Sequence, residues 1–193
     1  MEGGSARTGA LTHKLRNMPK RKLLRILACL GLVVLVGSFV LYKFVWLHPE
    51  TDGQSATVIR DIDGDTIVVN LDGRKETIRY LGINTPETVD PRKPVQCFGH
   101  EASNRMKSLL TGGRVILVAS PNREDRDKYG RLLRYVELPD GTDLNLKMLR
   151  DGYAYEYTYG TPYSRQDKYR AAEASARAAN RGLWSPSTCD GRL

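Results

Sequence analysis

Histidine is scarce in this sequence, with three residues in a chain of 193, and His100 is the only one beyond residue 50. This scarcity excludes a Ser/His/Asp triad, an H-E-x-x-H zinc site and any hydrolase that relies on a pair of histidines. The sequence also lacks a Walker A loop and the glycine fingerprint of a Rossmann fold. Acid–base and electrostatic catalysis would therefore come from carboxylates, arginines and a hard metal ion.

Positive charge is unevenly distributed along the chain. The net charge is +8, but residues 1–50 hold eight basic and two acidic residues and so contribute +6 of it. The remaining 143 residues, 51–193, are close to neutral, so bulk charge alone does not indicate a nucleic-acid-binding protein. The length fits one domain with an appendage. Charged residues at 27% and hydrophobic residues at 40% exclude wholesale disorder and a polytopic membrane protein.

A long apolar run lies near the start of the chain. Residues 26–42 are uncharged and, across Lys43, the run continues to residue 47, about the length that crosses a bilayer. Basic residues at 20–25 precede it, which predicts a cytoplasmic N-terminus. We therefore expect a cytoplasmic tail at 1–25 and a single transmembrane anchor at 26–47 in the cell membrane. The rest of the chain, which we call the body, would lie outside the cytoplasm. The alternatives are a signal peptide cleaved near 36–38, which would secrete the body, and a buried core helix.

Cysteine usage agrees with export. Cys29 lies inside the apolar run, which leaves Cys97 and Cys189 as the only cysteines of the body. Disulfides persist outside the cytoplasm. We therefore expect a Cys97–Cys189 disulfide, with two unpaired thiols as the alternative.

The body reads as one domain at 56–187, between a polar linker at 48–55 and a C-terminal tail at 188–193. Segments rich in β-branched residues predict five strands, at 56–62, 66–71, 76–83, 114–119 and 132–138. Helices are predicted at 98–110, at 144–150 with Gly152 as its C-cap, and at 164–180, which opens on a Ser164-x-x-Asp167 capping box. This pattern predicts an α+β domain on a closed or nearly closed five-stranded antiparallel barrel.

Three polar clusters are candidates for chemistry. Residues 61–66 carry three aspartates at alternate positions, a pattern that suits either a hard cation or only a polar turn. Residues 79–87 place Arg79 in an apolar strand, where its charge needs a ligand or an ion-pair partner. Residues 127–131 combine lysine, tyrosine, glycine and arginine, which suits phosphate binding with a stacked ring or else a solvated turn.

Taken together, these clusters resemble the staphylococcal nuclease (thermonuclease) family. Asp63-Gly64-Asp65-Thr66, Arg79 with Asn84-Thr85-Pro86-Glu87, and Asp127-Lys128-Tyr129-Gly130-Arg131 agree with the family in order and spacing. The similarity runs from about residue 56 to 185, where residues 182–185 resemble its closing motif. The resemblance implies an OB-fold, a five-stranded barrel with three helices. It also implies a Ca²⁺-dependent endonuclease that hydrolyses DNA and RNA to 3′-phosphate products, and we expect a monomer.

The resemblance also assigns roles. Arg79 and Arg131 would clamp the scissile phosphate, and Glu87 would act as general base or orient the attacking water. The metal ligands would be Asp65, Asn84 and the Thr85 carbonyl, and the substrate-binding residues would be Lys128, Tyr129, Tyr157 and Tyr159.

This sequence departs from the staphylococcal pattern at Asn84, where that pattern has aspartate. The amide keeps an oxygen ligand but removes a negative charge, so Ca²⁺ affinity should fall unless Asp61 or Asp63 compensates. Two other function classes remain open, a catalytically silent OB module that only binds nucleic acid or protein, and an anchored structural protein of the envelope. The retained arginines and Glu87 favour the enzyme, because a silent module has no need of them.

Overall fold

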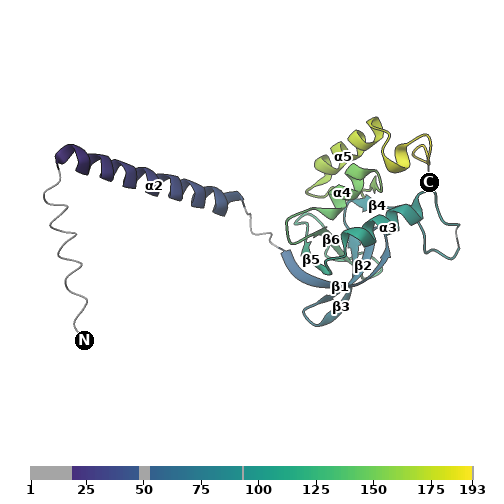
Figure 1. The fold of residues 1–193 in the computed structure, drawn as a ribbon. Helices are drawn as coiled ribbons and strands as arrows, with labels where there is room; N and C mark the ends of the chain where they lie inside the picture. The colour runs from purple at the N-terminus through teal and green to yellow at the C-terminus, as the bar shows by residue number, and fades with distance from the viewer. Residues whose placement is uncertain (1–18, 48–52, 93, 193) are drawn as a thin grey trace. The chain divides into compact units, whose positions relative to one another are not determined.

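The computed structural model describes residues 19–47, 53–92 and 94–192 (Figure 1). It contains two compact units, Met1–Glu50 and Thr51–Leu193. In the first unit, α2 (Lys20–Leu47) covers the apolar run. Among the helices of the described residues, none has the length and apolar character needed to cross a membrane. The structure thus gives no support to the anchor predicted at 26–47, and most of the predicted tail, residues 1–18, lies outside the described residues.

The second unit is built on a closed five-stranded barrel, which confirms the predicted OB-fold. Its strands follow the order β1-β2-β3-β6-β5 around the barrel. They are β1 (Gly53–Asp63), β2 (Thr66–Leu71), β3 (Arg74–Tyr80), β5 (Arg114–Val118) and β6 (Leu132–Glu137). One strand pair departs from the predicted antiparallel barrel, because β3 and β6 pair in parallel. A closed ring with an odd number of strands cannot alternate direction all the way round, so one neighbouring pair has to be parallel.

The third predicted strand was too long. The sequence predicts one strand at 76–83, but β3 ends at Tyr80 because the chain turns at Gly82, where φ is +81°. A Cβ atom at Gly82 would lie 2.5 Å from the ring of Tyr163, so only glycine fits this turn. The chain then continues as β4 (Ile83–Asn84), which pairs with β7 (Tyr155–Glu156) in a small second sheet that the sequence did not predict.

The three predicted helices of the body are confirmed as α3 (Gly99–Leu109), α4 (Leu144–Asp151) and α5 (Gln166–Ala178), followed by a 3₁₀ turn, η1 (Gly182–Trp184). Gly152 ends α4 in a left-handed conformation, as predicted. The predicted capping box is wrong, because α5 begins two residues later and no described side chain caps it. The Ser164 hydroxyl lies instead 3.0 Å from the hydroxyl of Tyr135, so it is engaged away from the helix start.

Two clusters of buried side chains hold this unit together. The main core fills the barrel and the inner faces of α3, α4 and α5. The second consists of Ala176, Leu183, Trp184 and Cys189, with Phe98 and Tyr155 packed against it. The predicted Cys97–Cys189 disulfide is present and joins the segment before α3 to this second cluster. At the N-terminal end of the unit, β1 begins at Gly53, three residues before the predicted domain boundary at residue 56.

Candidate active site

A cleft of about 700 Å³ opens at one end of the barrel. It is lined by the β1–β2 turn, the chain from β3 through β4 to residue 87, and the loops that contain residues 123–131 and 157–163. All ten residues predicted to act in catalysis, metal binding or substrate binding line it: Asp65, Arg79, Asn84, Thr85, Glu87, Lys128, Tyr129, Arg131, Tyr157 and Tyr159. These residues are far apart in sequence, so the fold brings together what the motifs predicted separately.

Arg79 is held rigidly at the base of the cleft. Its Nη1 donates to the carbonyl oxygens of Tyr80 and Ile83, both at 2.7 Å. Its Nη2 donates to Asn84 Oδ1 at 3.0 Å and lies 3.1 Å from Asp65 Oδ2. None of the described residues accepts a hydrogen bond from Nε. The guanidinium therefore brings a fixed positive charge and one spare donor, and it meets the need for a partner that the sequence indicated.

Asp65 and Asn84 place side-chain oxygens beside this guanidinium, and the backbone of Thr85 is hydrogen-bonded to Asp65. The Asp65 carboxylate is buried, and its Oδ2 accepts the backbone N–H of Thr85 at 2.8 Å. A Cβ atom at Gly64 would lie 2.8 Å from Thr85 Cγ2, so glycine permits the β1–β2 turn to approach Thr85 this closely. A carboxylate, an amide oxygen and a backbone carbonyl are the donor types that Ca²⁺ prefers. The predicted donor set fits a hard cation.

The alternative that all three aspartates of residues 61–65 form a metal site is wrong. Among the described residues, no group of three His, Cys, Asp or Glu side chains is arranged to hold a metal ion. Burial raises the pKa of the Asp61 carboxyl to about 6, against weaker opposing effects of Ser103 and Lys107. Burial and the neighbouring Asp65 carboxylate raise the pKa of Asp63 to about 7. Burial thus disfavours the charged form of both carboxyls.

The Asp61→Asn variant should be more stable than the wild type at pH 8, by about 1 kcal/mol. The folded state holds the pKa of Asp61 above its ordinary 3.8, so ionisation favours the unfolded state and the wild type loses stability as pH rises from about 4 to 6. The full shift corresponds to about 3 kcal/mol, which partial exposure of the carboxyl reduces. Urea unfolding in a metal chelator should show a gain that shrinks as pH is lowered to 4. A gain that is the same at both pH values would contradict this assignment.

Glu87 is oriented by the backbone that follows it. Its Oε1 accepts three N–H groups, from Thr88 at 2.8 Å, Val89 at 2.7 Å and Asp90 at 3.1 Å. In the described part of the chain, Oε2 accepts no hydrogen bond. One carboxylate oxygen is thus fixed and the other is left for a ligand in the cleft, an arrangement that suits a group that orients or deprotonates water.

Arg131 is presented by the tight turn at residues 127–131. Asp127 Oδ1 accepts the backbone N–H groups of Tyr129 and Arg131, at 2.9 and 3.0 Å, and Gly130 has a φ of +79°. Asp127 Oδ2 accepts from Arg131 Nε at 2.7 Å. Partial burial raises the pKa of Asp127, but the hydrogen bonds from Arg131 and the backbone outweigh it and hold the pKa below its usual range. Neither Nη group of Arg131 has an acceptor among the described residues, so the planar fork is free to bind an anion.

Tyrosine rings surround these charges at the rim of the cleft. Tyr129 and Tyr159 are 72% and 64% exposed, and the rings of Tyr157 and Tyr159 stack with centroids 6.5 Å apart. The guanidinium of Arg131 lies 5.4 Å, and the ammonium of Lys128 5.0 Å, from the centre of the Tyr129 ring. Exposed rings beside cations suit stacked bases and their phosphates.

Two further residues have a place at this site that the sequence analysis missed. Arg123 lines the cleft and donates from Nη1 to the carbonyl of Thr161 at 2.7 Å. Gln96 accepts the backbone N–H of Glu87 on its Oε1 at 2.6 Å. Neither lies in one of the three motifs, and both contacts join segments that local sequence patterns do not connect.

Comparison with known proteins gives consistent matches. The family model of staphylococcal nuclease homologues matches residues 77–186. The thermonuclease of Staphylococcus hyicus is 34% identical over 166 residues, which cover 80% of this chain and 96% of that protein. The thermonuclease of Staphylococcus intermedius is 38% identical over 82% of this chain and 94% of its own. Endonuclease YncB of Bacillus subtilis is 41% identical over 69% of this chain and 63% of its own.

Proposed function

The chain belongs to the staphylococcal nuclease family and is a phosphodiester hydrolase, and from this premise we propose that it cleaves DNA and RNA in the cleft between Arg79, Glu87 and Arg131. The proposal rests on one observation, that two side chains with hydrogen-bonding groups to spare line the same cleft. Among the described residues, both Nη groups of Arg131 are without an acceptor and Glu87 Oε2 is without a donor. The first suits the phosphate and the second suits the attacking water.

The arginines act on the phosphate. The Nη groups of Arg131 donate to its non-bridging oxygens, and Arg79 adds a fixed charge and its Nε–H from the base of the cleft. Both interactions strengthen as negative charge grows on these oxygens in the transition state. Because the two side chains are already held by Asp127 and Asp65, little reorganisation is needed when the substrate binds.

Glu87 acts on the water. Its Oε2 takes a proton as the water oxygen bonds to phosphorus, and the bond from phosphorus to the 5′ oxygen breaks. The 5′ oxygen is protonated from solvent, which leaves a 3′-phosphate. The three N–H groups on Oε1 keep the carboxylate in one orientation throughout.

Ca²⁺ fits the oxygen donors of Asp65, Asn84 and Thr85, and when bound it would supply positive charge for the phosphate oxygens. With Asn84 in place of an aspartate, we expect weaker binding of the cation than a set with two carboxylates would give.

The Asn84→Asp variant should therefore bind Ca²⁺ more tightly. The new carboxylate keeps the oxygen that accepts from Arg79 and adds a negative charge, so the half-saturating Ca²⁺ concentration should fall about tenfold. Titration calorimetry and the Ca²⁺ dependence of activity would both measure the change. The matched control, Asn70→Asp, puts the same charge on an exposed position of β2 and should leave the titration unchanged. Equal or weaker binding in Asn84→Asp would contradict the ligand assignment.

We further propose that the bases stack on Tyr129, Tyr157 and Tyr159, with Lys128 beside the backbone. Stacking on exposed rings has little sequence preference, which is consistent with cleavage of both DNA and RNA. We propose that the enzyme acts as a monomer.

We also propose that the enzyme works outside the cytoplasm. The Cys97–Cys189 disulfide and the basic residues before the apolar run both support this location. Cell fractionation should recover the oxidised protein with the membrane, if residues 26–47 stay attached as an anchor, or in the medium, if they are cleaved. Recovery in the cytosol with free Cys97 and Cys189 thiols would contradict the proposal.

Digestion of plasmid DNA and of RNA by the purified full-length protein tests the activity itself. In millimolar Ca²⁺ both substrates should be cleaved, and a chelator should stop cleavage. A silent binding module would retard both nucleic acids in a gel without shortening them. A wild-type protein as inert as its Glu87→Gln variant would overturn the enzymatic proposal.

A further inference from the structure

Gln96 and Glu87 are joined by two hydrogen bonds. The Glu87 N–H donates to the Gln96 side-chain oxygen at 2.6 Å, and the Gln96 N–H donates to the Glu87 carbonyl at 2.9 Å. The intervening segment contains the N–H groups of residues 88–90 that fix Glu87 Oε1. The chain leaves Glu87 and returns to it at Gln96, so Gln96 closes the loop that orients the carboxylate.

The residues that follow Gln96 pack against the backbone at Glu87 and Thr88. A Cβ atom at Gly99 would lie 2.7 Å from Thr88 Cγ2 and 3.2 Å from the Glu87 carbonyl oxygen, so the start of α3 packs directly against this backbone. Phe98 takes a left-handed φ of +65° to make the approach, and its ring packs against the second core cluster. The placement of Glu87 thus depends on how residues 96–99 are held.

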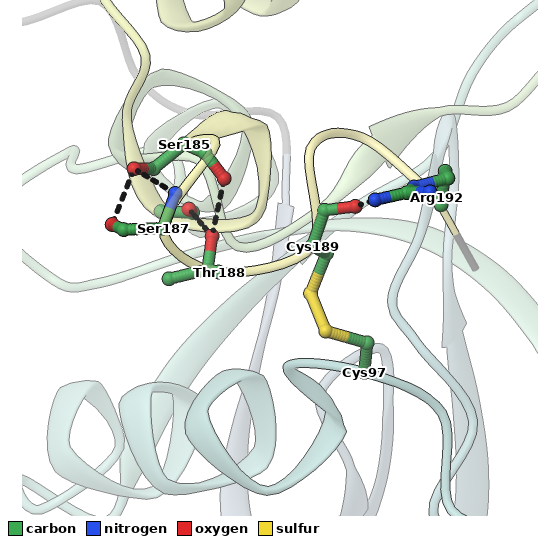
Figure 2. The surroundings of a disulfide bond; sticks show 7 residues. Cys97, Ser185, Ser187, Thr188, Cys189 and Arg192 are labelled. Atoms are coloured by element: carbon green, nitrogen blue, oxygen red, sulfur yellow. Dashed lines mark hydrogen bonds between the residues drawn. A yellow bond between two sulfur atoms is a disulfide. The ribbon is translucent and has the colours of Figure 1, made fainter.

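The disulfide joins this segment to the C-terminal end of the chain. Figure 2 shows Cys97 bonded to Cys189, which lies in the C-terminal segment. Cys189 is 4% exposed and packs with Leu183 and Trp184, whereas Cys97 is exposed. The C-terminal segment is itself fastened, since the Gly191 N–H donates to the Leu183 carbonyl at 2.9 Å. A covalent bond therefore connects a well-packed cluster to the residue next to Gln96.

The same cluster also contacts the strand pair β4–β7. The Trp184 ring contacts the Tyr155 ring edge to face, with centroids 5.0 Å apart. Tyr155 lies in β7, opposite Asn84 in β4. The C-terminal segment is thus in contact with the strand pair that contains Asn84. It is also bonded, through Cys97, to the segment that contains Gln96.

We propose that Gln96 is a positioning residue for Glu87 and that the Cys97–Cys189 disulfide fixes Gln96 in place, so that the nuclease is fully active only when this disulfide is oxidised. The proposal rests on the role of Glu87 in the proposed function. A dithiol reductant would attack the disulfide at Cys97, the exposed residue of the pair. The S–S bond breaks, two thiols form, and the reductant is oxidised to its own disulfide. The enzyme would be restrained in the reducing cytoplasm in which it is made and active after export.

The disulfide lies outside the main core, which fills the barrel. Of the described residues that form the main core, none is a cysteine, and the disulfide attaches only to the second cluster. Reduction should therefore loosen Glu87 while leaving Arg131 and the substrate-binding rings in place. Since a displacement of about 1 Å of a catalytic group can cost about 10²-fold in rate, we expect an effect on kcat with KM almost unchanged.

The test compares full-length protein carrying Cys29→Ser in its oxidised and dithiol-reduced forms, with the reduced thiols alkylated. Cys29 is the free cysteine of the described residues, so its removal leaves one redox couple. The reduced form should lose 10- to 100-fold in kcat with KM within twofold. Binding of a phosphorothioate oligonucleotide and the circular dichroism spectrum should not change.

Gln96 variants of the oxidised protein separate positioning from folding. Gln96→Ala should lose as much kcat as reduction does, and reducing it should add less than threefold, because both changes release the same contact. Gln96→Glu keeps the side-chain oxygen that accepts from Glu87 and should recover most of the activity.

The outcomes distinguish the two proposals. An oxidised wild type without nuclease activity would refute the proposed function. An active oxidised protein whose kcat survives both reduction and Gln96→Ala would refute the positioning role alone. If reduction unfolds the protein, the oxidised Gln96→Ala variant decides, since unchanged kcat there overturns the proposal.

Discussion

Replacing Glu87 with glutamine should lower kcat by about 10³-fold and leave KM within a few-fold of the wild type. Glutamine keeps the Oε1 atom that accepts the N–H groups of residues 88–90, so the loop should retain its shape. The substitution replaces Oε2, the atom that we propose takes the proton from water, with an NH₂ group. Because the change falls on one atom and one chemical step, the loss should appear in kcat. Single-turnover cleavage of a labelled oligonucleotide measures it directly.

Glu124→Gln is the matched control for this experiment. Glu124 also lines the cleft and is exposed, so the control removes the same charge from the same region. It should change kcat less than threefold. If both variants lost activity equally, the effect would be one of overall charge in the cleft. If Glu87→Gln kept nearly full activity, the proton acceptor would have to be another group.

The parts of the site that could be predicted are those coded by short motifs. The turn at residues 127–131 is one example, because aspartate accepts the N–H groups two and four residues later and glycine takes the left-handed conformation. The position of Arg79 in a strand followed by a turn is another. Such features depend on neighbours within a few residues, so the sequence contains the information that fixes them.

The contacts that sequence reasoning missed connect distant segments. The hydrogen bond from Glu87 to Gln96 joins residues nine positions apart. The close packing of Gly82 against Tyr163 joins residues 81 positions apart. The pairing of β4 with β7 follows from that turn, and two-residue strands are too short to produce a pattern of alternation. The capping box at Ser164 failed for the same reason, since a tertiary contact with Tyr135 takes the hydroxyl.

This difference explains why the disulfide was predictable while its consequence was not. Two cysteines in a body that is predicted to be exported suggest a bond between them, whatever the fold. That the bond adjoins Gln96, and that Gln96 closes the loop of Glu87, becomes visible only when residues 87, 96 and 189 are seen together. The proposed link between redox state and activity is therefore a property of the tertiary structure.

Arg131→Lys should lower kcat by about 10²- to 10³-fold, the cost of removing one preorganised donor group from a developing negative charge. Arg131 uses Nε to bind Asp127 at 2.7 Å, which leaves both Nη groups for the phosphate contacts that we propose. An ammonium group has a single nitrogen and cannot hold Asp127 and present a planar fork at the same time. Lysine at 131 therefore either keeps the ion pair or reaches the phosphate. The loss should be larger in kcat than in KM, since the missing contacts are strongest in the transition state.

Arg105→Lys is the control, because Arg105 repeats the local chemistry of Arg131 outside the cleft. It pairs with Asp151 at 2.8 Å and lies 5.9 Å from the centre of the Tyr153 ring, so it too combines a carboxylate and a tyrosine. Its replacement should lower stability slightly and leave kcat within twofold. If Arg131→Lys behaved like this control, the charge at 131 would suffice without the fork, and phosphate binding would rest on Arg79. If it lost the expected activity while an oligonucleotide still bound, the fork would be acting on the transition state, as the free Nη groups imply.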